Sequence, residues 1–429
     1  MTIPKKFLLA ALAVTLIQTT GCSSKGEPAA EPTASLQPQA TQVTETESTM
    51  TPAQSQQPDP TPSASAALKA DKNAMMERSL ISTGNTYRMK RVIEQAKSGK
   101  DVTVAYLGGS ITEGFNSLEH SYAKQSFQYF ADYYGTGSNV KYVNAGMAGT
   151  PSTLGLIRVD RDVLDHEPDV VFVEFAVNDS TDAQSLTAYE SLVRRLMNSK
   201  KQPAVVLVFT LTETGYSVQN EMETIGSHYG LPMISVKNAI QSELQAGTMT
   251  WKDYSDDTVH PDRNGHTLIA DMIQHYYTVL EGKPKDSEAK LPDATVYGKD
   301  FEGMVMLDAE SFKPDSLGTF DPEPTIKQFP TGWSNRSAGG NQSFSFDVTA
   351  SSLFIVIREN NDPSLGAAVV LVDGEAKLAL DGNNSSGWNN PTAKLVFRDS
   401  KVKKHHIEVK MGIGSEQKEF SILAFGVVK

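Results

Sequence analysis

Short apolar runs alternate with amphipathic stretches between residues 101 and 282 of the 429-residue chain. Near-continuous apolar runs predict buried strands at Val102–Leu107, Val140–Asn144, Val170–Phe175, Ala204–Leu211 and Pro232–Val236. Helix-like segments lie between these runs, and a final one covers Gly265–Leu280. This alternation predicts an α/β fold with a parallel sheet that is covered by helices on both faces. Ligands in such sheets bind at the carboxyl ends of the strands.

The pattern changes near Lys283–Pro292, after which helical periodicity disappears. Short alternating runs follow: Ser343–Val348, Leu353–Arg358, Ala367–Val372, Ala376–Leu380, Ala393–Phe397, His406–Lys410 and Phe420–Val427. Asp373-Gly374 separates two of these runs and predicts a tight hairpin turn. We therefore expect an α/β domain over residues 68–283 and an all-β sandwich over residues 293–429.

The N-terminus has the three parts of a secretory signal. Lys5 and Lys6 precede an apolar run, Phe7–Ile17, which is too short to span a bilayer alone. Small residues then lead to Cys22, where a bacterial lipoprotein signal would place its lipidated cysteine, although Thr19 replaces the usual leucine. Residues 1–22 are predicted to be a lipoprotein signal peptide, so the protein would be extracytoplasmic and anchored to the bacterial membrane through Cys22. Plain secretion is the alternative.

Residues 23–67 are rich in Ser, Thr, Pro, Gln and Ala and have almost no large apolar side chain. Such a segment cannot bury enough surface to offset its chain entropy, so it is predicted to be a disordered tether. The formal net charge is −12, from 51 acidic and 39 basic residues. This balance disfavours nucleic acid as a partner. With Cys22 as the one cysteine, no intrachain disulfide can form.

Four short blocks carry residues of catalytic types. Leu107-Gly108-Gly109-Ser110-Ile111-Thr112 follows a predicted strand, and its glycines allow a sharp turn that exposes the serine hydroxyl. Asn144-Ala145-Gly146-Met147-Ala148-Gly149 follows the next strand and permits close approach of backbone N–H groups to a ligand. Glu174-Phe175-Ala176-Val177-Asn178-Asp179 ends the third strand. Taken singly, each block is more typical of an ordinary loop or helix cap than of a catalytic site.

The fourth block, Asp257-Thr258-Val259-His260-Pro261, precedes the last helix. An aspartate three residues before a histidine can hold one imidazole nitrogen while the other faces a nucleophile. Asp256 and Asp262 are rival partners for this imidazole. His228, His266, His405 and His406 have no comparable context and are assigned to surface or packing roles.

The four blocks in this order resemble the SGNH hydrolase (GDSL-like lipase/esterase) family over about residues 100–282. The resemblance implies a three-layer α/β/α sandwich with a five-stranded parallel sheet, and hydrolysis of esters or thioesters. Carried over to matching positions, it implies Ser110, His260 and Asp257 as the catalytic triad. Ser110, Gly149 and Asn178 would form the oxyanion hole. Gly108-Gly109-Ser110 departs from the family's common Gly-Asp-Ser.

No metal or organic cofactor is expected, because the implied reaction needs none and no Cys/His metal spacing is present. The substrate is expected to be an ester on an acetylated polysaccharide or cell-wall glycan. Trp333 and Trp388 could stack on sugar rings, or could pack at a domain edge. A lipolytic esterase or lysophospholipase is one alternative, and a non-catalytic glycan-binding lipoprotein of the cell surface is another.

Overall fold

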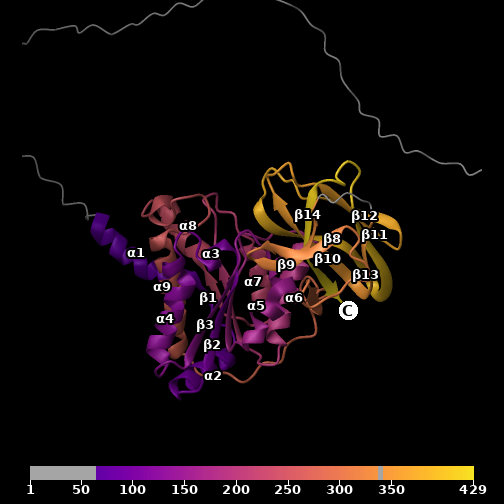
Figure 1. The fold of residues 1–429 in the computed structure, drawn as a ribbon. Helices are drawn as coiled ribbons and strands as arrows, with labels where there is room; N and C mark the ends of the chain where they lie inside the picture. Colours follow the sequence, from indigo (N-terminus) through magenta and orange to yellow (C-terminus); the bar gives the residue numbers. More distant parts are fainter. Residues whose placement is uncertain (1–63, 337–341) are drawn as a thin grey trace, which may run out of the picture. The chain divides into compact units, whose positions relative to one another are not determined.

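A computed structural model describes residues 64–336 and 342–429 of the chain (Figure 1). The predicted signal peptide with Cys22 and residues 23–63 of the predicted tether lie outside the described residues. Within the described residues, no helix combines the length and the apolar character needed to cross a bilayer.

An α/β domain forms the first part of the described chain. Its strands are β1 (Leu80–Ser82), β2 (Val102–Gly108), β3 (Val140–Gly146), β4 (Val170–Glu174), β5 (Ala204–Phe209) and β6 (Met233–Ser235). Its helices are α1 (Ala64–Ser79), α2 (Tyr87–Lys97), α3 (Ser110–Glu113), α4 (Tyr122–Tyr134), α5 (Ser152–Asp162), α6 (Ala183–Met197), α7 (Gln219–His228), α8 (Val236–Ala246) and α9 (Arg263–Glu281). Short 3-10 turns are η1 (Leu118–His120), η2 (Leu164–His166) and η3 (Trp251–Asp253).

The sheet has the strand order β1-β6-β5-β4-β2-β3. All five predicted strands are present and pair in parallel, which confirms the α/β fold class. A sixth strand, β1, was not predicted and pairs antiparallel with β6. It is three residues long, too short to show a period in the sequence.

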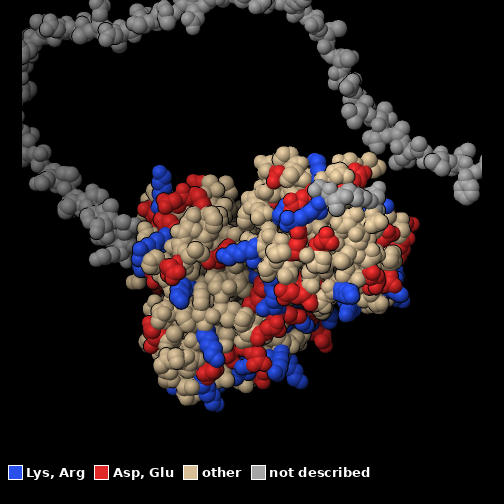
Figure 2. All heavy atoms as spheres, in the orientation of Figure 1, with Lys and Arg blue, Asp and Glu red and all other residues tan. Residues whose placement is uncertain are grey.

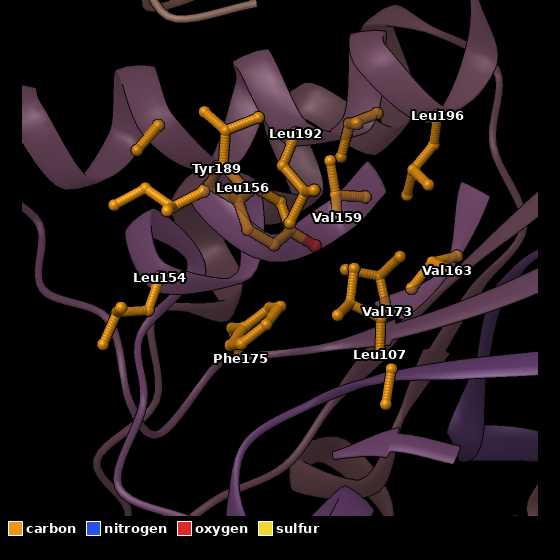
Figure 3. Packing of buried hydrophobic residues seen from close by; sticks show 14 of the residues in the cluster. Leu107, Leu154, Leu156, Val159, Val163, Val173, Phe175, Tyr189, Leu192 and Leu196 are labelled. Atoms are coloured by element: carbon orange, nitrogen blue, oxygen red, sulfur yellow. The ribbon is translucent and has the colours of Figure 1, made fainter. Parts of the chain in front are cut away.

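Alternate side chains of each central strand enter opposite layers of the core, as the pleat requires. In β2, Ala105 and Leu107 pack with α5 and α6, whereas Val104 and Tyr106 pack with α4 and α9. Figure 3 shows the first of these layers, where Leu107, Val173 and Phe175 face leucines and valines of the two helices. Because both faces of the sheet are covered, the central strands β4 and β5 are almost wholly apolar, whereas the edge strand β3 carries Lys141 and Asn144.

A β domain forms the second part. Its strands are β7 (Met304–Leu307), β8 (Phe320–Ile326), β9 (Phe329–Arg336), β10 (Phe344–Asn360), β11 (Ala367–Val372), β12 (Glu375–Asp381), β13 (Trp388–Met411) and β14 (Glu419–Val428). The order is β12-β11-β13-β10-β14-β9-β8, with β7 also paired to β14, and every pairing is antiparallel. The prediction of an all-β second domain is confirmed, and hydrogen bonds join its strands into one continuous sheet. That sheet folds over a single core to which β8 and β11 both contribute.

The predicted hairpin at Asp373-Gly374 joins β11 to β12. Both residues have positive φ, 54° and 81°, as a tight turn between twisted strands requires. Two long strands differ from expectation. The predicted runs Ser343–Val348 and Leu353–Arg358 together form β10, and Ala393–Phe397 and His406–Lys410 together form β13. Register shifts at Ala350/Ser352 in β10 explain why one strand has the sequence pattern of two.

The two domains share apolar contacts. Phe354 and Val356 of β10 belong to the same buried cluster as Leu156 and Ile157 of α5. A side-chain carbon added at Gly426 would lie 2.8 Å from Ile157, so β14 and α5 are in close contact. The connecting segment is also fixed. The fully buried carboxylate of Glu190 accepts hydrogen bonds from the backbone N–H groups of residues 296, 297 and 298, at 2.8, 2.6 and 2.8 Å.

Candidate active site

Ser110 is the first residue of α3 and directly follows the turn after β2. The turn is too crowded for side chains. A carbon added at Gly108 would lie 2.2 Å from the Thr112 hydroxyl, and one added at Gly109 would lie 2.3 Å from Oδ1 of Asn178. Glycine at both positions therefore lets the strand pass directly into the helix and place the Ser110 hydroxyl at the carboxyl end of the sheet.

The structure brings Ser110, His260 and Asp257 together in one hydrogen-bonded series. Nε2 of His260 lies 2.9 Å from Oγ of Ser110, and Nδ1 lies 2.8 Å from Oδ2 of Asp257. The segment with the aspartate and the histidine directly precedes α9, so it meets the serine across a separation of 150 residues. The imidazole thus joins a hydroxyl on one side to a carboxylate on the other.

Asp257 is positioned to stay ionised. Its partial burial opposes ionisation, but the backbone N–H groups of His260 and Val259 and the imidazole itself hold the pKa of this carboxyl below its usual value. Those two N–H groups donate to Oδ1 at 2.6 and 2.7 Å, which leaves Oδ2 for the imidazole. The rival Asp262 instead caps α9 by accepting the N–H of Gly265 at 2.8 Å. Asp257 is therefore the aspartate on the imidazole.

The other two predicted site residues, Gly149 and Asn178, follow β3 and β4, the strands on either side of β2. The amide of Asn178 lies against Gly109, the residue before the serine. Gly149 has a φ of +68°, which favours glycine, and a carbon added there would lie 2.6 Å from Cζ2 of Trp388. Trp388 is the first residue of β13, so the β domain reaches the loop that carries Gly149.

Comparison with known proteins agrees with this geometry. Residues 106–268 match the model of the GDSL-like lipase/acylhydrolase family. These residues form a GDSL-like lipase/acylhydrolase domain. The chain is accordingly a carboxylic ester hydrolase. A search of curated proteins gives no match.

Several solved structures are similar. A two-domain esterase active on acetylated mannans is 27% identical, with a TM-score of 0.74, over 82% of this chain and 99% of that one. The same esterase crystallised with mannopentaose matches equally, over 98% of its chain. An acetylxylan esterase from Geobacillus stearothermophilus is 18% identical, with a TM-score of 0.36, over 42% of this chain and 96% of that one.

The sequence alone did not single out two buried carboxyls beneath the loops of the acylhydrolase domain. Glu174 ends β4, is fully buried, and accepts hydrogen bonds from the hydroxyls of Thr210 and Thr112 at 2.6 and 3.1 Å. Asp179 accepts the backbone N–H of Ser152 at 2.7 Å. Burial raises the pKa of each carboxyl to about 7. An acidic residue at the end of the otherwise apolar run Val170–Glu174 was the available sequence signal.

The two tryptophans have different surroundings. Trp333 lies in β9 with 1% of its surface exposed and packs against Phe344 and Phe425, so of its two alternatives the structure bears out packing and not stacking on a sugar. Its apolar neighbours make it part of the β-domain core. Trp388 is 50% exposed and lies beside Gly149. Trp388 therefore remains available to a ligand at the acylhydrolase site.

Three histidines outside the series, His266, His405 and His406, have structural partners. His266 is buried, and its Nδ1 accepts the N–H of Tyr122 at 3.2 Å, while burial lowers its pKa to about 4. His405 and His406 bond to aspartates of the β domain. In the part of the chain that the structure describes, no three His, Cys, Asp or Glu side chains are grouped as a metal site would require.

Proposed function

We propose that this chain is an extracytoplasmic serine esterase that removes O-acetyl groups from a polysaccharide, with Ser110, His260 and Asp257 as its triad. The observation that carries the proposal is the unbroken hydrogen-bonded series from hydroxyl to imidazole to carboxylate. A serine is a weak nucleophile unless an adjacent base takes its proton, and this series supplies the base and holds it in place.

In the proposed reaction, Oγ of Ser110 attacks the acetyl carbonyl while Nε2 of His260 takes the hydroxyl proton. The ionised Asp257 stabilises the imidazolium that forms. The imidazolium then gives its proton to the departing sugar oxygen, which leaves an acetyl group on the serine. Water activated by the same imidazole hydrolyses this acetyl ester and restores the free hydroxyl.

The developing oxyanion needs donors at the same place. The backbone N–H groups of Ser110 and Gly149 and the side-chain amide of Asn178 are proposed to supply them. Two observations support this role: Asn178 lies against Gly109, the residue before the proposed nucleophile, and Gly149 has a positive φ that favours glycine.

Two observations favour a polysaccharide as the alcohol part of the ester. The similar two-domain esterase, which is active on acetylated mannans, aligns with both domains of this chain. The half-exposed indole of Trp388 lies beside Gly149, where it offers an apolar face to a sugar ring. We propose an acetylated mannan-like glycan as substrate.

The proposal places the enzyme outside the cytoplasm, held to the membrane by a lipid on Cys22. It is supported by the signal-like N-terminus and the tether composition of the sequence. Replacement of Cys22 by serine should release the protein from the membrane fraction of the expressing bacterium. Equal amounts of the wild-type protein and C22S in the membrane fraction would contradict a lipid anchor.

The decisive test of the activity measures acetate released from acetylated mannan, acetylated xylan and acetylated peptidoglycan. Wild-type protein should release acetate from mannan, and S110A should release none while retaining its fold. Release of acetate by S110A at the wild-type rate would show that Ser110 is not the nucleophile. A strong preference for long-chain acyl esters over acetyl esters would instead indicate a lipolytic enzyme, since each buried CH₂ contributes about 0.8 kcal/mol.

A further inference from the structure

A groove of about 580 Å³ runs along β3, the edge strand of the parallel sheet, where the α/β and β domains meet. One wall comes from Val143 and Met147 at the end of β3 and from His166 after α5. The other wall comes from the turn between β8 and β9, at Lys327 and Gln328. Its volume lies within the range of about 300–1,000 Å³ usual for small-molecule sites, which often lie between domains.

The groove shares two loops with the proposed active site, although neither Ser110 nor His260 lines it. Met147, two residues before Gly149, lines the groove. Its backbone N–H donates to the carbonyl oxygen of Gly108 at 3.0 Å. Leu118, which is 67% exposed, lines the groove from a second loop. That loop also carries Phe115, whose ring lies 4.4 Å from the imidazole of His260. A ligand in the groove would thus lie against the loops that hold the reacting groups.

The lining suits a sugar. Leu118, Val143 and Met147 offer apolar surface to the C–H faces of a ring, while His166 and Gln328 offer hydrogen-bonding groups to its hydroxyls. Figure 2 shows basic and acidic side chains side by side at the junction of the two domains.

Charge in the groove favours a neutral ligand. Arg158 and Arg161 both pair with Asp162, at 2.9 and 2.5 Å. Glu113 adds a negative charge to the lining, and Lys327 a positive one. Three basic side chains thus line the groove together with two acidic ones, Glu113 and Asp162, so it lacks the concentrated positive charge that an acidic polysaccharide would select.

We propose that this groove is a distal sugar-binding region, which holds a segment of a neutral acetylated glycan away from the ester being cleaved. This inference rests on the proposed function and extends it. Trp388 lies at Gly149, and the groove begins at Met147 of the same loop. A glycan chain that crosses this loop contacts both domains and presents its acetyl group to Ser110.

The test uses the full chain with one variant on each wall, H166A and Q328A. KM for acetylated manno-hexasaccharide should rise about 3- to 10-fold, the equivalent of one lost hydrogen bond, with kcat unchanged. KM for acetylated disaccharide and for p-nitrophenyl acetate should stay at the wild-type value. K377A, at an exposed residue of β12 on the far edge of the β-domain sheet, is the matched control.

The outcomes separate the two proposals. If the wild type releases acetate from the hexasaccharide and both variants behave like K377A, the distal region is wrong and the proposed function stands. If the wild type cleaves p-nitrophenyl acetate and no acetylated sugar, the proposed function fails and this inference fails with it. A steep rise of the hexasaccharide KM with added salt would contradict a neutral, hydrogen-bonded glycan.

Discussion

The two domains contribute to the site in different ways. The α/β domain supplies Ser110, His260 and Asp257 from loops at one edge of a parallel sheet. The described residues of the β domain supply no member of that series, yet Trp388 touches the loop of Gly149. Under the proposed function, bond cleavage would depend on the α/β domain alone, and contact with the rest of the substrate on both domains. Variants in the α/β site should therefore lower turnover on every ester, whereas variants of Trp388 should affect glycan substrates selectively.

The largest effect is expected from S110A. Loss of the nucleophile should lower kcat by at least about 10³-fold on p-nitrophenyl acetate and on acetylated mannan alike. Stopped assays of both substrates, with circular dichroism to verify the fold, measure this. If S110A lost activity on acetylated mannan alone, the assignment of bond cleavage to the α/β domain site would be contradicted.

N178A should have the next largest effect. Removal of one oxyanion donor costs about 10²–10³ in kcat, again on both substrates and with little change in KM. N220A, which alters an exposed asparagine at the start of α7, is the control and should retain wild-type kinetics. An N178A enzyme with normal kcat would remove Asn178 from the oxyanion hole.

W388A should change substrate preference more than turnover. Loss of the indole face should raise KM for acetylated mannan about 10-fold, which corresponds to about 1.4 kcal/mol. Kinetics on p-nitrophenyl acetate should stay within about twofold of wild type, since that ester is too small to need the β domain. W388F should fall between W388A and the wild type. Equal losses on both substrates would mean that Trp388 supports the loop of Gly149 and does not bind the glycan.

The smallest effect concerns stability and pH. Burial raises the pKa of Glu174 and of Asp179 to about 7 in the folded protein, whereas unfolded carboxyls titrate near 4. Between these values the folded state retains protons that the unfolded state has lost. The contribution of the two protonated carboxyls to the free energy of unfolding is therefore complete below about pH 4 and is lost as pH rises to about 7. Each group contributes a slope of up to about 1.4 kcal/mol per pH unit.

E174Q removes one of these ionisations. Its melting temperature relative to wild type should therefore be higher at pH 8 than at pH 5. E288Q, at an exposed position, should show no such difference between the two pH values. A constant offset for E174Q across this range would mean that Glu174 is ionised throughout in the folded protein.

The α/β architecture could be predicted from the sequence because it depends on the hydrophobic pattern within short segments of the chain. A strand buried on both faces must be apolar along its length, as Val102–Gly108 is, and the glycines that follow must accommodate a crowded turn. Ser110, Gly149 and Asn178 follow strands that end at one edge of the sheet. His260 instead lies between α8 and α9, so its place beside Ser110 could be predicted only because the order of the four motifs resembles the SGNH hydrolase family.

Other features depend on contacts that no local pattern contains. The three residues of β1 are too few for a period, and the bulge near Ser352 interrupts the alternation of a single long strand. Trp333 and Trp388 are both aromatic residues in β-rich sequence, and only the folded β domain buries the first and exposes the second. The contact of Trp388 with Gly149 depends on how two domains pack, which neither segment specifies alone.

The carboxylate of Glu190 and the apolar cluster shared by α5 and β10 imply that the β domain is not an interchangeable appendage. A catalytic fragment ending before residue 293 would expose Ile157 to water and leave a buried anion without the amide groups of residues 296–298. Such a fragment should aggregate instead of working as a smaller esterase. Replacing the β domain with another β module would require rebuilding both contacts.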